Sequence, residues 1–103
     1  MLFVSYSKDK AGGSDLRAEN RDAHLTYMAL HEKHVLIGGP TSNSTDAGTD
    51  GTLLIIDFPD FESVKRFLDQ DPYARAGLFV ERTVRVFQPT RVCIDALLGV
   101  GSE

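Results

Sequence analysis

The sequence predicts one α+β domain of the ferredoxin-like type, in which two helices cover one face of an antiparallel sheet. The main observation is the order of the predicted elements, which is strand, helix, strand, strand, helix, strand. The length of 103 residues fits a single domain. The composition, 42% hydrophobic and 25% charged, is typical of a folded globular protein.

The first half of the chain predicts a strand, a long helix and a short second strand. Residues 2–7 alternate between two faces, with apolar positions 2, 4 and 6 on one of them. Ser14 is a typical N-cap for a helix that we expect to run to about Lys33. Residues 35–37 form a short apolar strand, and the Gly-Gly-Pro at 38–40 is expected to end it.

The long helix carries two stripes at 100° per residue. The first stripe is expected to face the sheet and consists of Leu16, Ala23, Tyr27 and Leu30. The second stripe mixes charged, imidazole and apolar side chains, which is typical of a helix edge beside a cleft. It consists of Arg17, Arg21, His24, Met28 and His31.

The second half predicts a loop, a central strand, two helices and a last strand. Residues 41–51 are rich in Ser, Thr, Asn, Asp and Gly and predict a flexible loop. Residues 52–58 give the strongest strand signal and are apolar on both faces. Asp60 is a typical N-cap for the second long helix, and residues 83–87 alternate as the last strand. The apolar positions of that helix are Phe61, Val64, Phe67 and Leu68.

With both helices on one face, the other sheet face lacks a cover. We therefore expect a second copy to pack sheet against sheet, giving a homodimer or a larger homo-oligomer. Residues 1–88 form the predicted domain and residues 89–103 a C-terminal extension. The stretch from Arg91 to Val100 is too apolar for a free tail, and it is expected to cover a sheet edge or to join an oligomer contact.

Composition also excludes several classes of function. The net charge of -4 and the lack of a basic block argue against nucleic-acid binding. No stretch is long enough to span a membrane, and the apolar start at residues 1–4 is too short for a signal peptide, so the cytoplasm is expected. Cys93 is the only cysteine, and we expect it to be a buried small hydrophobe rather than a nucleophile.

Two motifs far apart in the sequence suggest a site. His24 lies in Arg-Asp-Ala-His-Leu, and Asp71 lies in Asp-Pro-Tyr-Ala-Arg. If the fold brings them together, His24 is a general base and Asp71 orients it. The alternatives are that His24 is an ordinary helix-edge residue and that Asp71 only caps the short helix that begins at Pro72. Both roles of Asp71 are compatible, with one oxygen capping the helix and the other accepting the His24 proton.

Four further residues are candidates for substrate binding. Arg21 lies one turn before His24 and is suited to a substrate carboxylate, unless it pairs with a neighbouring acid. Tyr73 is suited to donating a hydrogen bond to an oxyanion, or to packing beside the cap. Gly39 and Pro40 are expected to line the cleft, mainly through their backbone. The three histidines lack the spacing of a metal site, so we predict no bound metal.

The motifs together resemble those of the YciI-like (YCII-related) proteins, small domains that form dimeric α/β barrels. The resemblance covers about residues 1–88. The matching positions are Arg21, His24-Leu25, Gly39-Pro40, residues 69–73 and residues 76–78. This chain departs from the family pattern at residues 32–34 and beyond Gln88.

The resemblance implies that His24 and Asp71 form the active-site pair of each subunit. It also implies chemistry such as dehydrochlorination of a chlorinated aromatic compound, and relatives of similar fold isomerise lactones.

Two hypotheses follow from the sequence. The first is a cofactor-independent enzyme in which His24 removes a proton from a small molecule, leading to elimination, isomerisation or ring opening. No phosphate-binding glycine loop is present, so no nucleotide cofactor is expected. The second is a non-catalytic metabolite-binding or assembly module of the same fold.

Overall fold

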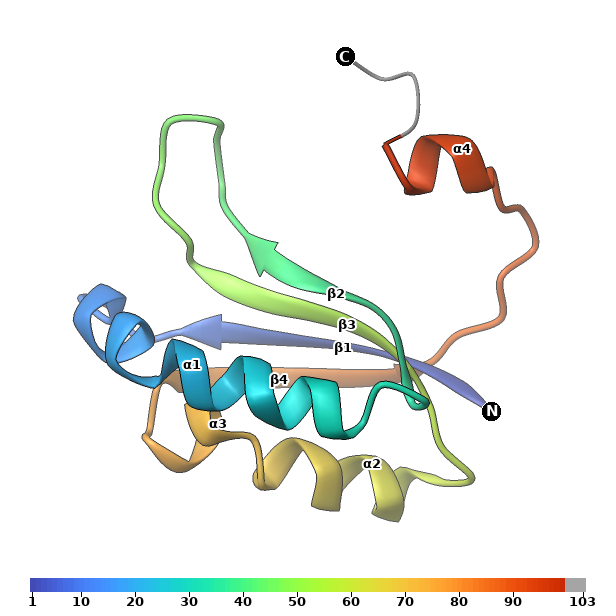
Figure 1. Cartoon of the computed structure of the whole chain (residues 1–103), viewed down its shortest axis with the longest axis horizontal. Helices are drawn as coiled ribbons and strands as arrows, with labels where there is room; N and C mark the ends of the chain where they lie inside the picture. Colours follow the sequence, from blue (N-terminus) through green and yellow to red (C-terminus); the bar gives the residue numbers. More distant parts are fainter. Residues whose placement is uncertain (100–103) are drawn as a thin grey trace.

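A computed structural model, which describes residues 1–99, contains a four-stranded antiparallel sheet with three helices on one face (Figure 1). The strand order is β2-β3-β1-β4, so β3 and β1 are central and β2 and β4 are edges. The predicted ferredoxin-like fold is confirmed. The elements are β1 Leu2–Asp9, α1 Ser14–Leu30, β2 Val35–Thr41, β3 Gly51–Asp57, α2 Phe61–Asp69, α3 Pro72–Arg75, β4 Phe79–Val86 and α4 Ile94–Leu97.

The two faces of the sheet differ as the alternation predicts. On β1, Phe3, Ser5 and Ser7 are buried beneath the helices, whereas the even-numbered positions are partly exposed on the open face. Apolar side chains between the sheet and α2 form the core. Its buried members are Phe3, Leu54, Ile56, Phe58, Val64, Phe67 and Leu68.

The predicted bounds of α1 were wrong at both ends. The N-cap is Gly13, not Ser14, and it makes no side-chain cap. A Cβ at Gly13 would lie 2.8 Å from the Leu78 side chain, so close packing requires glycine there. The helix ends at Leu30 because a turn follows, in which the His34 amide donates to the His31 carbonyl at 2.8 Å.

The predicted sheet-facing stripe of α1 was wrong in part: Leu16 and Tyr27 are half-buried, and Tyr27 packs against the core, but the other two residues do not face inward. Ala23 and Leu30 are exposed, and His24 is the only buried residue of this helix. The helix is rotated so that the mixed stripe containing His24 and Met28 lies toward the sheet. Asp9 bonds Arg17 of this stripe and Asp71 bonds His24, and the apolar pattern alone does not reveal these partners.

Both edge strands are longer than predicted. β2 continues through Gly38, Gly39 and Pro40, since an edge strand tolerates a proline without an amide proton. β4 begins at Phe79 rather than at residue 83, and its charged positions lie at an edge, where Arg82 pairs with Asp69 at 2.8 Å. Because β4 contains several charged residues, the alternation of apolar and polar side chains that predicts a strand is not visible in its first half.

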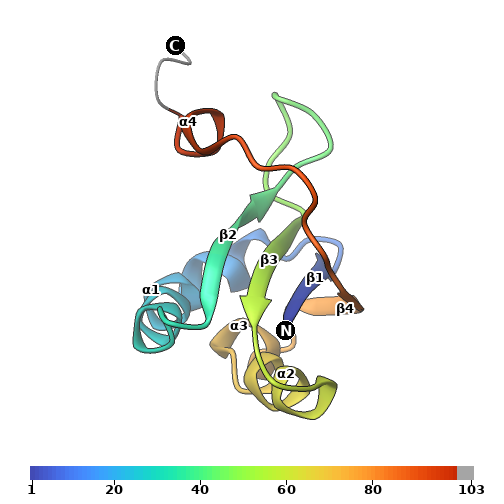
Figure 2. The same cartoon turned by 90° about the vertical axis from the view of Figure 1, so that its right-hand side faces the viewer.

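The C-terminal extension leaves the end of β4 and carries the short helix α4. It lies on the side of the sheet opposite α1, α2 and α3 (Figure 2). Cys93 is exposed on this segment, so the prediction of a buried cysteine was wrong. Val100 and the rest of the predicted extension lie outside the described residues. Within residues 1–99, no helix is long and apolar enough to cross a membrane.

Candidate functional site

A cleft of about 250 Å³ lies between α1 and β2, with β3 as its floor. Both α1 and α3 supply side chains to it, and β2 supplies backbone at the Gly-Gly-Pro. Five residues proposed from the sequence line it: Arg21, His24, Gly39, Pro40 and Tyr73. The sixth, Asp71, contacts the cleft through His24.

His24 and Asp71 are brought together from positions 47 residues apart. The His24 Nδ1 lies 2.8 Å from the Asp71 Oδ1, and the two residues are only 8% and 3% exposed. The Tyr73 amide donates to the same oxygen at 3.0 Å. Because this carboxylate oxygen accepts, the imidazole must donate through Nδ1. The Nε2 nitrogen of His24 is then left for the cleft.

The double role of Asp71 differs in one detail from the prediction. One oxygen, Oδ1, both caps α3 and accepts the imidazole N–H, rather than one oxygen doing each. Pro72 at the first turn of α3 has no amide proton to satisfy, so the Tyr73 amide is the one that the cap reaches. The cap therefore fixes the carboxylate against His24.

Tyr73 forms the wall beside His24. Its ring stacks on the imidazole with centroids 4.0 Å apart and planes 15° apart, and the residue is 2% exposed. Burial raises the pKa of the Tyr73 hydroxyl, while the charges of Arg17 and Arg21 act in the opposite direction. The hydroxyl therefore keeps its proton at neutral pH and remains a hydrogen-bond donor.

Arg17 is a site residue that the sequence did not assign. It binds both oxygens of Asp9 at 2.9 Å, the Gly51 carbonyl at 3.1 Å and the Thr52 hydroxyl at 2.8 Å. Its guanidinium carbon lies 4.7 Å from the centre of the Tyr73 ring. Burial opposes the charge of Arg17, but the hydrogen bond and the charge of Asp9 outweigh it and raise the guanidinium pKa.

The position of Arg17 on the mixed stripe was the only sequence signal for that role. Because Asp9 neutralises its charge, Arg17 ties the ends of β1 and β3 to Tyr73 rather than offering a free charge.

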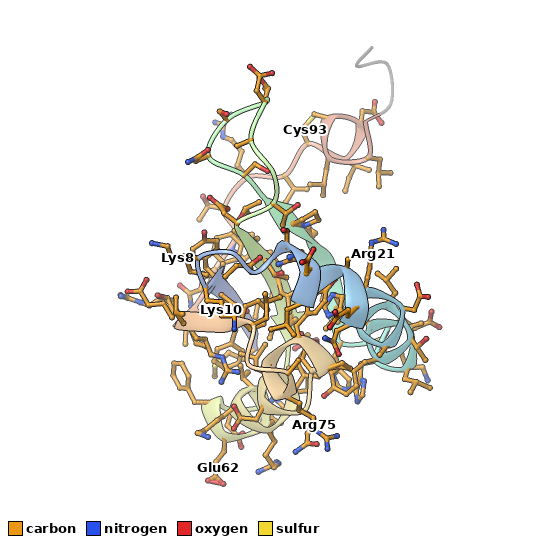
Figure 3. All side chains as sticks on the ribbon, turned by 90° about the vertical axis from the view of Figure 1, so that its left-hand side faces the viewer. Lys8, Lys10, Arg21, Glu62, Arg75 and Cys93 are labelled. Carbon is orange, nitrogen blue, oxygen red and sulfur yellow. The ribbon has the colours of Figure 1, made fainter. Side chains whose placement is uncertain are left out.

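Arg21 differs from Arg17 because its charge is free. It is exposed, and within residues 1–99 it makes no ion pair, so the alternative pairing with Glu19 or Asp22 does not occur. Figure 3 shows Arg21 extending from α1 to the surface. It lines the cleft together with His24, and an anionic ligand there would meet its charge.

Backbone from β2 shapes the opposite wall. A Cβ at Gly38 would lie 2.8 Å from the Leu54 side chain, whereas a Cβ at Gly39 would meet nothing within 4 Å. A side chain at Gly38 would thus displace the end of Leu54, and Gly39 leaves space in the cleft. The remaining cleft-lining residues that the sequence did not assign are Leu25, Met28, Val35, Thr52 and Leu54.

The other two histidines, His31 and His34, form hydrogen bonds with backbone carbonyl groups. The His31 Nδ1 lies 2.9 Å from the Tyr27 carbonyl oxygen, and the His34 Nδ1 lies 2.8 Å from that of Asp57. In the described part of the chain, no three His, Cys, Asp or Glu side chains are grouped as metal ligands would be.

Comparison with known proteins agrees with this fold. The family model of the YCII-related domain matches residues 1–88, and the chain belongs to this family. It is 35% identical to Protein YciI of Escherichia coli, over 85% of this chain and 97% of that protein. The match to the family model ends at Gln88, before the extension.

Two solved structures extend the comparison. The 5-chloro-2-hydroxyhydroquinone dehydrochlorinase of Burkholderia phenoliruptrix, in complex with 2,5-dihydroxybenzoquinone, superposes with a TM-score of 0.80 at 32% identity, over 85% of this chain and 94% of that chain. A protein of Agrobacterium tumefaciens has a TM-score of 0.55 at 12% identity, over 88% and 95% of the two chains. The second likeness shows the fold alone.

Proposed function

We propose that this chain is a small-molecule enzyme in which His24 transfers a proton and Asp71 orients it. The observation that supports this best is the buried bond of 2.8 Å between the His24 Nδ1 and Asp71, on the wall of a cleft. An imidazole exchanges protons near neutral pH. A carboxylate on one ring nitrogen fixes the tautomer and stabilises the cation that forms when the other nitrogen takes a proton.

The cleft favours a small substrate that carries an acidic or anionic oxygen. Arg21 supplies an unpaired positive charge, and Tyr73 supplies a protonated hydroxyl in a buried setting. Both groups stabilise negative charge that develops on oxygen when His24 removes a proton. The volume of about 250 Å³ fits a single ring better than a polymer segment.

The dehydrochlorinase neighbour suggests elimination as the reaction. In such a reaction, a hydroxyl proton is first moved to the ring carbon that bears chlorine, which gives a keto tautomer. Loss of a second hydroxyl proton to the base then sends an electron pair into the ring, and chloride leaves with its bonding pair. The net change is the loss of HCl, with no electron donor or acceptor required. On this chain His24 would hold the proton, while Arg21 and Tyr73 would hold the ring oxygens.

We further propose a homodimer that works in the cytoplasm. The open face of the sheet carries exposed apolar side chains, including Ile37 and Phe87, that nothing in residues 1–99 covers closely. A second copy packing sheet against sheet would bury them. The candidate cleft lies on the helical face, so dimerisation leaves it accessible.

The test is whether the protein turns over a panel of chlorinated hydroxyhydroquinones and small lactones. Turnover is measured as release of chloride and as loss of substrate. We expect His24→Ala to lower kcat at least 100-fold, as loss of a general base does. His31→Ala is the matched control, since His31 lies on the same helix with its Nδ1 on a carbonyl and does not line the cleft. Full activity in His24→Ala would contradict the proposal. Binding of panel members without conversion by the wild type would favour the non-catalytic module.

A further inference from the structure

The C-terminal extension and the open sheet face enclose a second, apolar cavity. It measures about 650 Å³. The extension, which forms one of its walls, lies on the side of the sheet opposite the helices α1, α2 and α3 (Figure 2). The sheet contributes Leu2, Ile37 and Ile55, and the extension contributes Val92, Ile94 and Leu97. Both walls are thus mainly apolar, although Arg91 also lines the cavity, and α4 does not close on its own sheet.

The apolar part of the open face lies at the same end of the sheet as α4. Leu2, Ile37 and Ile55 occupy this end, with Ile37 opposite Ile55 in the register, and Phe87 follows β4 there. At the other end of the sheet, Lys8 lies opposite Glu81, so that end is charged. A partner that covers the apolar end therefore reaches the extension as well.

The size of the sheet shows why the extension is needed. Four strands of at most eight residues cover about 26 by 19 Å, or roughly 500 Å², at about 3.3 Å per residue and 4.8 Å between strands. A stable interface buries about 800 Å² per partner. The sheet face alone is therefore small for a stable interface, and the exposed apolar side chains of the extension add to the area that a partner can bury.

We propose that the extension is an arm that holds a second copy of this chain. The open-face side chains of the partner fill the cavity, and α4 of each copy packs on the sheet of the other. In a two-fold dimer this contact forms twice, once for each arm, so it contributes twice to the free energy of association. The inference rests on the proposed homodimer and gives residues beyond the family domain a role in it.

The experiment is sedimentation equilibrium of the full chain and of single variants, which needs no substrate. Leu97→Asp places a charge in the cavity wall, and we expect it to raise the dimer dissociation constant at least tenfold. The matched control is Leu98→Asp, because Leu98 is the next residue, is 70% exposed and does not line the cavity. We expect it to change the dissociation constant less than threefold. Ile94→Asp should behave as Leu97→Asp does.

A variant of the sheet separates the arm from the dimer itself. Ile55→Asp on the open face should give a monomer. If Ile55→Asp is monomeric while Leu97→Asp and Ile94→Asp keep the wild-type dissociation constant, the sheet-to-sheet dimer is supported. The proposed role of the extension in that dimer is then refuted. A wild-type chain that is monomeric at micromolar concentration would refute both. Binding of one anilinonaphthalene sulfonate per chain by the wild-type dimer, lost in Leu97→Asp, would show that a small molecule rather than the partner fills the cavity.

Discussion

Asp71 joins the stability of the fold to the chemistry of the site. Its Oδ1 accepts both the Tyr73 amide and the His24 imidazole, so the carboxylate cannot turn without breaking the cap of α3. His24 is in turn held between this oxygen and the ring of Tyr73. The three side chains form one rigid unit, and such preorganisation is what a base needs before substrate arrives.

We predict that Asp71→Ala lowers the free energy of unfolding by about 2–4 kcal/mol. Loss of an N-cap costs about 0.5–2 kcal/mol, and leaving the buried imidazole N–H unpaired costs about 1–3 kcal/mol. Asp71→Asn keeps an acceptor oxygen and should lose only about 1 kcal/mol. Urea unfolding of the three proteins measures the difference, and equal stability of the two variants would contradict the shared role of Oδ1.

Tyr73 gives a prediction for alkaline pH. Its pKa is raised by burial, so the folded state keeps the hydroxyl protonated above the ordinary value of about 10. The resulting contribution to stability is complete below the unfolded pKa and is lost as pH rises through the folded pKa. Arg17→Gln removes a charge that lowers this pKa, and the pKa should therefore rise further.

Ultraviolet titration of tyrosinate measures this change. The difference between wild type and Tyr73→Phe isolates Tyr73 from the other two tyrosines. A Tyr73 pKa that is unchanged in Arg17→Gln would show that the guanidinium does not act on the phenol, and the contact at 4.7 Å would then be packing only.

At the scale of elements, the strand ends beneath the cleft depend on close backbone packing. A Cβ at Gly51 would lie 2.7 Å from the Ser7 carbonyl oxygen and 2.8 Å from the Thr41 and Tyr6 hydroxyl oxygens. Arg17 also binds the Gly51 carbonyl. The start of β3 is therefore fixed from three sides, which positions the floor of the site.

Gly51→Ala should lower the free energy of unfolding by about 1–3 kcal/mol, as overpacking does. Gly39→Ala is the control on the facing strand, because its Cβ meets nothing within 4 Å. Its stability should change by less than about 0.5 kcal/mol. Thermal or urea unfolding of both variants provides the comparison, and a Gly51→Ala protein as stable as wild type would mean that β1 and β3 can separate at this point.

At the scale of the whole molecule, the sheet separates two surfaces with different tasks. The helical face holds the cleft with His24 and Arg21, and the open face holds the apolar end and the extension. Figure 3 shows this separation, since Arg21 lies on α1 and Cys93 on the distant extension. Substitutions in the arm can therefore be tested without disturbing the candidate site.

The fold was predictable because strong local signals agreed with its order. Alternation on β1 and the caps at Asp60 and Asp71 each match the structure. Residues whose role depends on distant partners and that lie in no motif were not predictable. Arg17 is a site residue because Asp9 and Thr52 neutralise and hold it, and no local pattern carries that information.

The rotation of α1 illustrates the same limit. A stripe with His24 at its centre faces inward because Asp71 satisfies the imidazole, while Ala23 and Leu30 remain at the surface. Apolar periodicity cannot detect a buried polar group whose partner lies 47 residues away. The His24–Asp71 pair was predicted from its motifs, and its catalytic role remains a prediction.

The most direct test of the central claim is the tautomer of His24 in solution, read from the nitrogen shifts of its ring in nuclear magnetic resonance spectra. We predict a neutral imidazole protonated on Nδ1, with a bare Nε2 able to take a proton from substrate. His31 and His34 provide internal references, because each Nδ1 lies on a carbonyl oxygen that can only accept. A His24 protonated on Nε2, with a bare Nδ1, would contradict the proposed role of Asp71 and leave no base facing the cleft.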